Sequence, residues 1–253
     1  MNIIFKNNIF YKLYLYYNLY IRHKALKVRT TYSQHQEDLF INNYFKDTNN
    51  GFYVDVGCYH PIKYSNTALL HNRGWQGINI DMNQTSIDLF NILRKKDKNI
   101  CAAISNENKE AIQYLDHAFS PINTLVKKFS DTTSKTISFN NHSEKKIFTH
   151  KFSQIVQAQE LQLNQIDFLN IDAEAHDFEV LEGIELSSYN IKLICIEMFD
   201  SQNQINEKKF KNYLIKYNYH LIKTIGPNGF FRSTTNSLII FFSLINQGYS
   251  FSI

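Results

Sequence analysis

Short apolar runs alternate with amphipathic stretches along most of the chain. The runs are rich in β-branched residues and end at a glycine or a polar residue, as buried parallel strands do; they lie at residues 52–56, 77–81, 100–104, 166–172 and 191–197. The amphipathic stretches have apolar residues at helical spacing and cover residues 32–45, 65–73, 85–96, 178–184 and 206–217. This alternation of strand and helix predicts a parallel sheet covered by helices.

The last part of the pattern predicts two further strands, residues 219–225 and 236–242, joined by the segment GPNGFFRST. Such a hairpin suits an antiparallel pair at a sheet edge. The whole pattern predicts an α/β, Rossmann-like fold of the class I methyltransferase type. In that fold a mostly parallel seven-stranded sheet has helices on both faces and a C-terminal antiparallel hairpin, and ligands gather at the carboxyl ends of the strands.

Two segments fall outside the alternation. Residues 1–31 are rich in aromatic residues but interrupted by Lys and Asn, so they are a poor membrane span and are expected to form a helical extension. The extension can lie on a membrane surface, or pack on its own domain or on a partner subunit, and the sequence leaves these alternatives open. Residues 117–150 are polar and predict an irregular insert, either a lid or plain disorder, within a domain of residues 32–253.

Composition narrows the functional classes. The formal charge is +4, the pI is about 8.7, and no Lys/Arg cluster interleaves with aromatic residues, which argues against a nucleic-acid partner. Three cysteines are too few and too scattered for a disulfide framework or a zinc site. Reduced thiols indicate a cytoplasmic protein, with peripheral contact at the inner membrane face as an alternative location.

Residues 51–81 carry the most informative pattern. A strand containing Asp55 ends at a glycine turn, Gly57, then a helix follows, and a second strand closes on Asp81. This is the order of a nucleoside-binding unit, in which the turn lets the backbone approach the ligand and the second acid can take both ribose hydroxyls. Because the turn has one glycine and Pro61 removes a backbone donor, S-adenosylmethionine fits better than a dinucleotide. The alternative is that both acids merely cap strand ends.

Two further residues are expected near the same ligand. Gln36 stands among polar residues at the start of the first helix, where it would lie over the nucleoside; a solvated helix entrance is the alternative. Ala103 belongs to the third strand, at whose end an adenine edge sits in this architecture. Gln36 and Ala103 are therefore candidate cofactor-binding residues.

Polar residues also follow two later strands. Asp172 and Glu197 end these strands, and Glu174 and His176 follow in the first loop. Carboxylates and an imidazole at one sheet edge are costly to bring together unless they bind a cation, a polar substrate or a transferable proton. Methylation of a hydroxyl needs a base, so His176, Asp172 or Glu197 is expected to act as one, or the acids hold a divalent metal ion that acidifies the hydroxyl. A solvated helix N-terminus is the alternative for each residue alone.

Four ordered pieces of the sequence resemble the FkbM family of S-adenosylmethionine-dependent methyltransferases. They are YSQHQEDLF, the block GFYVDVGCYHP…SNT…RGWQGINID, the block IDFLNIDAEAHDFEVLEG, and ICIEMF. The resemblance runs from about residue 32 to residue 242. It implies an enzyme that methylates a hydroxyl, often on a sugar of a surface polysaccharide, a lipopolysaccharide or a glycosylated natural product. The expected partner is a carbohydrate or nucleotide-sugar acceptor, and a homo-oligomer is compatible with this interpretation.

The resemblance also implies roles for the cofactor-side residues. It places Asp55 and Gly57 at the methionine end of the cofactor and Asp81 at the ribose. Asn66 and Thr67, from the SNT piece, would lie near the same pocket.

The resemblance also implies that Asp172, Glu174 and His176 face the acceptor. Ala175 departs from the family pattern, where glycine is usual, and its Cβ changes how the neighbouring side chains are aimed. Residues 1–31 lie outside the resemblance and inherit nothing from it.

Two other functional classes stay open beside this one. A dinucleotide-dependent oxidoreductase is disfavoured by the single-glycine turn, and failure to bind nicotinamide cofactors would exclude it. A non-catalytic scaffold with the same fold, docked at a membrane through residues 1–31, would not bind S-adenosylmethionine.

Overall fold

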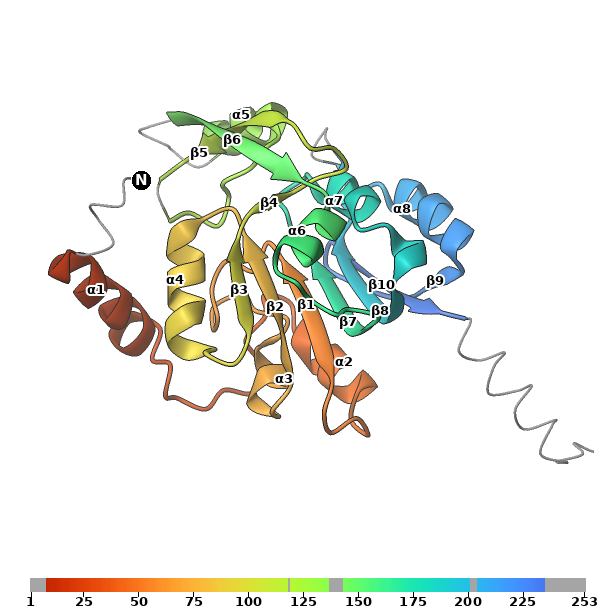
Figure 1. Ribbon diagram of the computed structural model, residues 1–253, viewed down its shortest axis with the longest axis horizontal. Coiled ribbons are helices and arrows are strands. Elements are labelled where there is room, and N and C mark those ends of the chain that lie inside the picture. Colours follow the sequence, from red (N-terminus) through yellow and green to blue (C-terminus); the bar gives the residue numbers. More distant parts are fainter. Residues whose placement is uncertain (1–7, 118, 137–142, 201–203, 235–253) are drawn as a thin grey trace, which may run out of the picture.

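A seven-stranded sheet forms the centre of the molecule, in the order β3-β2-β1-β7-β8-β10-β9 (Figure 1). The computed structural model describes residues 8–117, 119–136, 143–200 and 204–234. The first five strands of this order are parallel, and β10 is antiparallel to both of its neighbours. The strands are β1 (Phe52–Val56), β2 (Gln76–Asp81), β3 (Lys98–Cys101), β7 (Gln165–Ile171), β8 (Asn190–Glu197), β9 (Tyr219–Ile225) and β10 (Asn228–Ser233). The predicted Rossmann-like α/β class is confirmed.

Alternate residues of each strand face opposite layers of helices. Val54 and Val56 of β1 belong to a core with α6 (Phe152–Ala158), α7 (Asp177–Gly183) and α8 (Glu207–Leu214). Tyr53, the residue before Val54, belongs to the core on the opposite face of the sheet, with α2 (Glu37–Tyr44) and α3 (Ala68–Asn72). Both faces of the central strands are thus buried, which explains why these strands are continuous apolar runs in the sequence.

The C-terminal hairpin differs from its prediction. Strand β10 occupies residues 228–233, inside the segment expected to be the connection, and the turn needs only Gly226 and Pro227. It lies between β8 and β9, so β9 alone of the pair is at the edge. The pairing succeeds because Phe230 and Phe231 are fully buried, one in each core. The predicted strand at residues 236–242 lies outside the described residues.

The insert expected to be irregular contains regular structure. It holds α5 (Lys127–Thr136) and β6 (Ser143–His150), and β6 pairs with β5 (Glu110–Leu115) and β4 (Ala103–Ile104) in a second, three-stranded sheet. The predicted third strand is split between the two sheets, since β3 ends at Cys101 and Ala103 starts β4. A strand with mostly exposed polar residues lacks the apolar alternation that would have revealed it.

The N-terminal segment packs on its own domain with one side. It forms α1 (Ile9–Tyr16), which continues as the π-helix η2 (Tyr17–Arg22) beside α4 (Gln84–Leu93). Leu15 and Leu19 are buried, and the Tyr11 hydroxyl donates a 2.8 Å hydrogen bond to Asp88 of α4. No helix in the described part of the chain is long and apolar enough to cross a membrane.

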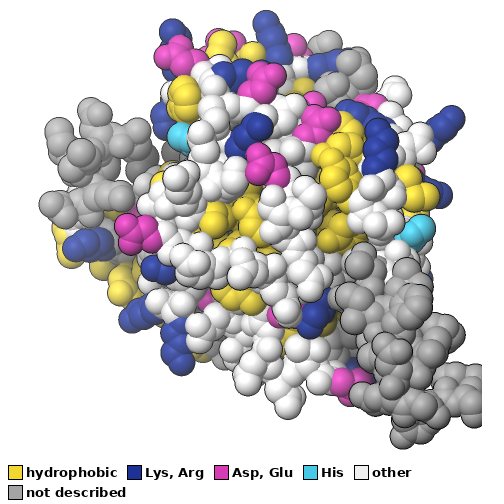
Figure 2. Space-filling model, turned by 45° about the vertical axis from the view of Figure 1, so that its right-hand side comes forward, with side chains coloured by type: hydrophobic (Ala, Val, Ile, Leu, Met, Phe, Trp, Pro, Cys, Tyr) yellow, Lys and Arg dark blue, Asp and Glu magenta, His cyan; other side chains and the backbone are white. Residues whose placement is uncertain are grey.

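Charged side chains of both signs are interspersed on the face shown in Figure 2. Small hydrophobic patches separate them, and the described part of this face carries no continuous basic stripe of the kind that follows a phosphate backbone. This agrees with the modest net charge of +4.

Candidate active site

A cavity opens at the carboxyl ends of β1, β2 and β7, with about 790 Å³ of empty space when the open solvent at its mouth is included. Its lining combines apolar side chains with polar groups from the strand ends and from the start of α4. This large cavity is lined by Gln34, Val56, Gly57, Tyr59, Tyr64, Ile80, Asp81, Met82, Asn83, Ser86, Ala102, Ala103, Ile104, Ser120, Pro121, Asn123, Leu125, Asp172, Ala173, Glu174, His176 and Val180. Gly57, Asp81, Ala103, Asp172, Glu174 and His176 are among the residues that sequence reasoning selected.

Gly57 lets the ends of β1 and β7 meet. Its φ is +80°, and a Cβ there would lie 1.7 Å from the carbonyl oxygen of Asp172. The backbone N–H of Asp172 donates a 3.0 Å hydrogen bond to Val56, while that of Gly57 donates a 2.9 Å bond to Ile80. Only glycine combines this conformation with such a close approach.

Asp81 ends β2 at the edge of the cavity. Its two carboxylate oxygens accept hydrogen bonds from the backbone N–H groups of Tyr59, at 2.9 Å, and Asn83, at 2.7 Å. Burial raises the pKa of this carboxyl to about 6, and nearby Asp55 adds to the shift. Each oxygen keeps a second acceptor position, so the ionised side chain can still accept hydrogen bonds from a ligand.

Asp55 lies beneath the cavity instead of lining it. Its carboxylate accepts a 2.7 Å hydrogen bond from the Thr67 hydroxyl and a 2.8 Å bond from the Asn170 amide. Asn66 donates a 3.0 Å bond to the same Asn170 side chain. Asp55, Asn66 and Thr67 therefore form a buried polar layer that supports the strand ends, and the Asp55 carboxylate has two neutral donors.

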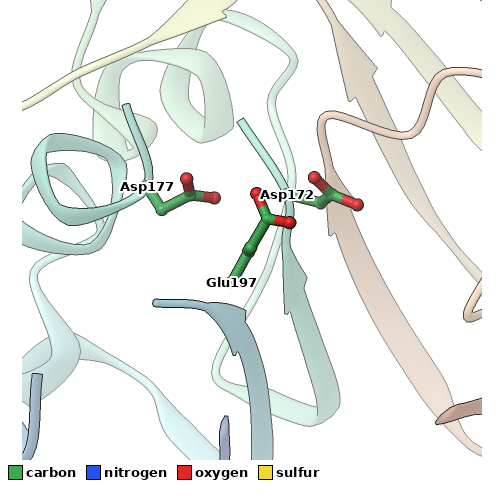
Figure 3. A group of neighbouring side chains, drawn as sticks. All are labelled: Asp172, Asp177 and Glu197. Carbon is green, nitrogen blue, oxygen red and sulfur yellow. The ribbon is translucent and has the colours of Figure 1, made fainter. Parts of the chain in front are cut away.

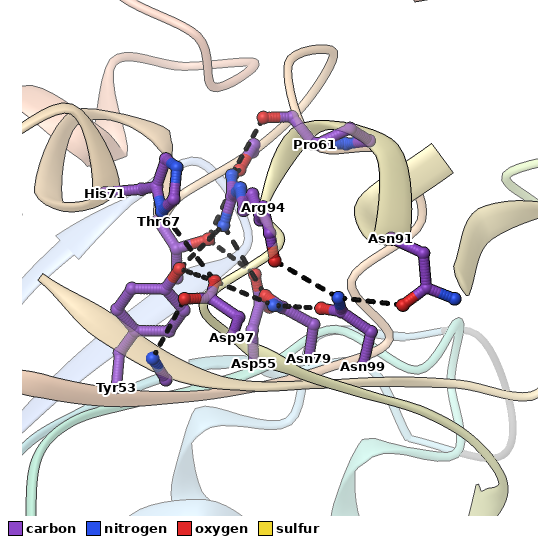
Figure 4. A network of polar contacts seen from close by, with 12 residues as sticks. Tyr53, Asp55, Pro61, Thr67, His71, Asn79, Asn91, Arg94, Asp97 and Asn99 are labelled. Carbon is purple, nitrogen blue, oxygen red and sulfur yellow. Dashed lines mark hydrogen bonds and ion pairs between the residues drawn. The ribbon is translucent and has the colours of Figure 1, made fainter. Parts of the chain in front are cut away.

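Arg94 stabilises this polar layer through hydrogen bonds, a role that the sequence did not suggest (Figure 4). Its guanidinium is buried and donates to the Thr67 hydroxyl at 2.8 Å, the Ser65 hydroxyl at 3.0 Å and the Pro61 carbonyl at 2.8 Å. It also donates to the hydroxyl of Tyr53, which itself donates to Asp97. The network holds the loop from β1 to α3 in place and supplies a positive charge beside Asp55.

A smaller recess adjoins the large cavity and shares Asp172 with it. The recess is acidic and amide-rich, and it includes the predicted residue Glu197 at the end of β8. It is lined by Gln34, His35, Glu37, Tyr64, Asn66, Asp172, Glu197, Pro227 and Asn228. Asp172 thus stands at the junction between the two spaces.

The loop after Asp172 has an uncommon backbone. Glu174 and Ala175 both have positive φ values, +53° and +69°. The turn aims His176 at Ser105, whose hydroxyl lies 3.0 Å from Nε2, while Nδ1 lies 3.9 Å from Glu179. Burial lowers the pKa of His176, so the ring is neutral at pH 7. The turn forms with alanine at the position where a glycine was expected.

Three carboxylates lie close together where β7 and β8 end, and in Figure 3 those of Asp177 and Glu197 are turned toward one another while that of Asp172 points to the other side. Asp172, Asp177 and Glu197 each offer an oxygen within 4.8 Å of the others. Burial and then the charge of Asp55 raise the pKa of Asp172 to about 7, and burial and then Asp172 raise that of Glu197 to about 11. The pKa of Asp177 is also raised, first by burial and then by Asp172. The predicted meeting of Asp172 and Glu197 at one sheet edge is what the structure shows.

Gln34, one of the polar residues at the start of the first helix that were expected over the nucleoside, borders both spaces. The candidate Gln36 is exposed, has a left-handed φ of +68° as the N-cap of α2, and lines neither. Several other site residues were not predicted from the sequence. Tyr59 and Tyr64 line the cavity from the loop after β1, and Asn228 reaches the recess from β10. Their polar or aromatic character is common in loops, so only the fold brings them to the site.

The comparison with protein families agrees with this geometry. The model of the methyltransferase FkbM domain matches residues 55–230, which is more than half of the chain and runs from the end of β1 into β10. No curated protein gives a match. The chain therefore belongs to the FkbM methyltransferase family.

Proposed function

We propose that this methyltransferase transfers a methyl group from S-adenosylmethionine to a hydroxyl of a carbohydrate or nucleotide sugar. The observation that carries the proposal is the position of Asp172. Its side chain borders both the large cavity at the strand ends and the acidic recess beside it. A carboxylate at such a junction can meet a donor on one side and an acceptor on the other.

The residues of the large cavity fit S-adenosylmethionine. Asp81 ends the second strand of the βαβ unit, where a ribose is bound in this architecture, and Ile80, Ala103 and Ile104 form an apolar wall suited to adenine. No Lys or Arg is present among the described lining residues, so the lining offers no cationic side chain to a phosphate. A ligand with a sulfonium cation suits this acidic setting better than a dinucleotide.

The acceptor side fits the hydroxyl groups of a sugar. The amide groups of Asn66, Asn228 and Gln34 and the carboxylates of the recess are donors and acceptors that can pair with several sugar hydroxyls. When bound, S-adenosylmethionine supplies a methyl group already activated on its sulfonium. The protein's own contribution is therefore to hold the hydroxyl in line and to accept its proton.

Asp172 is the proposed base. A pKa of about 7 balances the fraction that is ionised against proton affinity, which favours general-base catalysis near neutral pH. His176 lines the large cavity, but its ring nitrogens lie toward Ser105 and Glu179. We therefore assign His176 a positioning role, in which it holds the turn that carries Glu174.

The test is a methyl-transfer assay with S-adenosylmethionine labelled in the methyl group and a panel of nucleotide sugars and glycans. Asp172→Asn should lower kcat by about 100-fold, the scale of a general base, while keeping affinity for the methyl donor. Glu207→Gln, an exposed acid on α8, is the control and should keep wild-type kcat. Transfer to amines but to no hydroxyl, or unchanged kcat in Asp172→Asn, would contradict the proposal.

A further inference from the structure

We infer that Asp172, Asp177 and Glu197 bind one divalent cation. The three side chains come from the end of β7, the first residue of α7 and the last residue of β8. One oxygen of each lies within 4.8 Å of the others, and Figure 3 shows the Asp177 and Glu197 carboxylates directed toward one another. Cations such as Mg²⁺ and Mn²⁺ are bound by carboxylates, with water completing the coordination.

The surroundings of Asp177 give an independent indication of a cation ligand. Its side chain is completely buried, and Oδ1 accepts a 2.7 Å hydrogen bond from the backbone N–H of Ala173. Oδ2 is also buried and has no hydrogen-bond partner of normal geometry in the described structure, although the backbone N–H groups of Ala175 and Asp177 act on the same carboxyl. Leaving a buried carboxylate oxygen without a hydrogen-bond partner is unfavourable, so the position of Oδ2 indicates a ligand for it.

The charged side chains around the three residues are acidic. No Lys, Arg or His of the described chain forms an ion pair with Asp172, Asp177 or Glu197. Glu37 and Glu174 add further negative charge to the same region. Like charges brought this close repel one another, and a bound cation would relieve that repulsion.

A sulfonium in the large cavity would not relieve it fully. Asp172 borders that cavity, but Asp177 and Glu197 do not. A cation held by all three would neutralise the two acids that face away from the methyl donor. It would also lie beside the acidic recess, which both Glu197 and Asp172 line.

The consequence for catalysis rests on the proposed function. A cation at this site would bind an acceptor hydroxyl and lower its pKa, so that Asp172, although made less basic by the same cation, can still take the proton. Cation binding itself does not depend on the identity of the methyl donor or the acceptor.

The test is a titration of the full chain, stripped with a chelator, with Mn²⁺ followed by electron paramagnetic resonance. Wild type should bind one Mn²⁺, and Asp177→Asn and Glu197→Gln should each weaken binding about tenfold or more. Glu182→Gln removes an acid from the same helix α7 and is the matched control, with unchanged affinity expected. Melting curves establish that each variant is folded, and Mg²⁺ should raise the Tm of wild type but not of Asp177→Asn.

Absence of saturable Mn²⁺ binding to the folded wild type, or equal affinity in Asp177→Asn, would overturn the cation site in favour of shared protons. Binding of S-adenosylmethionine is measured in the same samples. If the wild type binds S-adenosylmethionine but no Mn²⁺, the proposed function stands and the cation site is refuted. If it binds Mn²⁺ but not S-adenosylmethionine, the proposed function is refuted and the cation site stands.

A second inference rests on the outer side of the N-terminal helix. We propose that α1 and η2 dock the protein on an anionic phospholipid surface. While Leu15 and Leu19 face the domain, the opposite stripe is apolar as well: Phe10 is 75% exposed, Leu13 56%, Tyr17 54% and Ile21 63%. Apolar residues on both sides of a short surface helix indicate a second partner for it.

The charges next to this stripe specify the partner. Residues 8–36 contain no Asp or Glu, and their Lys and Arg residues are Lys12, Arg22, Lys24, Lys27 and Arg29. Leu26 and Val28, between the last of these, are almost fully exposed. Aromatic and aliphatic residues flanked by basic ones match the interface of an anionic bilayer, to which each basic residue near the surface adds attraction.

Sedimentation with vesicles of phosphatidylcholine, with and without phosphatidylglycerol, tests this docking. The full chain should sediment only with the anionic vesicles and should be released by salt. Phe10→Ser with Ile21→Ser should abolish sedimentation, while Ile205→Ser with Ile215→Ser, exposed apolar residues elsewhere, should not. No sedimentation of wild type, or a dimer in solution that the N-terminal variant disrupts, would overturn the membrane partner.

Discussion

A Cβ atom on Gly57 would lie 1.7 Å from the carbonyl oxygen of Asp172, so the glycine turn after β1 and the acid after β7 are in direct backbone contact. The contact joins the two strand ends that border the large cavity. It also explains why the turn keeps a glycine although the phosphate-binding glycines of dinucleotide enzymes are absent.

Gly57→Ala should destabilise the protein and abolish donor binding. The φ of +80° costs an alanine about 1–2 kcal/mol, and the clash with Asp172 adds about 1–3 kcal/mol. Gly74 is a matched control, because its φ is +91° but no atom lies within 4 Å of the point that a Cβ would occupy there. Gly74→Ala should therefore lose only the conformational part in urea unfolding. Equal losses in the two variants would show that the Gly57–Asp172 contact is unimportant.

Binding of S-adenosylmethionine should weaken as the pH falls through about 6. The folded-state pKa of Asp81 is raised to that value, so the carboxylate is ionised above it and protonated below it. If the ionised form binds the ribose, affinity should fall by up to about tenfold for each pH unit below 6. Asp81→Asn should bind weakly and with little pH dependence. Calorimetry at several pH values measures both, and a flat wild-type profile would exclude Asp81 as the ribose ligand.

Replacing Arg94 should lower the free energy of unfolding more than replacing an exposed Lys or Arg does. Arg94→Met leaves Thr67, Ser65 and Tyr53 without their buried donor, and a loss of about 3–5 kcal/mol in the free energy of unfolding is expected. Arg94→Lys keeps the charge but not the five-donor geometry, so it should restore only part of the stability. Lys98→Met, an exposed cation on β3, should stay within about 0.5 kcal/mol of wild type. A small effect of Arg94→Met would refute the supporting role of the network.

Ala175→Gly should stabilise the turn after β7. Ala175 has a φ of +69°, where glycine is favoured, and relief of this strain should gain up to about 1 kcal/mol, reduced by the loss of a buried methyl group. Ala173→Gly is the control in the same loop and should lose stability, because Ala173 is not in the left-handed region. Equal losses in both variants, measured by urea unfolding, would show that the turn stores no strain at Ala175.

The sequence predicted the parts of the fold that rest on buried parallel strands. The run at residues 52–56 is β1 itself, and the acids Asp81 and Glu197 close β2 and β8 as expected. Since parallel strands bring their carboxyl ends to one edge, the meeting of Asp172 with Glu197 followed from the order of elements alone.

Other parts depend on contacts that no local pattern contains. Arg94 stands in the charged segment LRKKDK, which is typical of a solvated turn, and only the packing of the fold buries it. Asp177 has the character of an ordinary acid at a helix N-terminus. Strand β10 enters the sheet between β8 and β9, so Asn228 reaches the recess through a topology that hydrophobic periodicity does not encode.

The most direct measurement is a calorimetric titration of the purified full chain with S-adenosylmethionine at about pH 7.5, well above the titration of Asp81. Saturable binding of one molecule, lost or weakened about tenfold or more in Asp81→Ala and kept in Glu207→Gln, is the predicted result. A folded wild type that gives no binding, or an Asp81→Ala variant that binds as tightly as wild type, would contradict the assignment of the large cavity to the methyl donor.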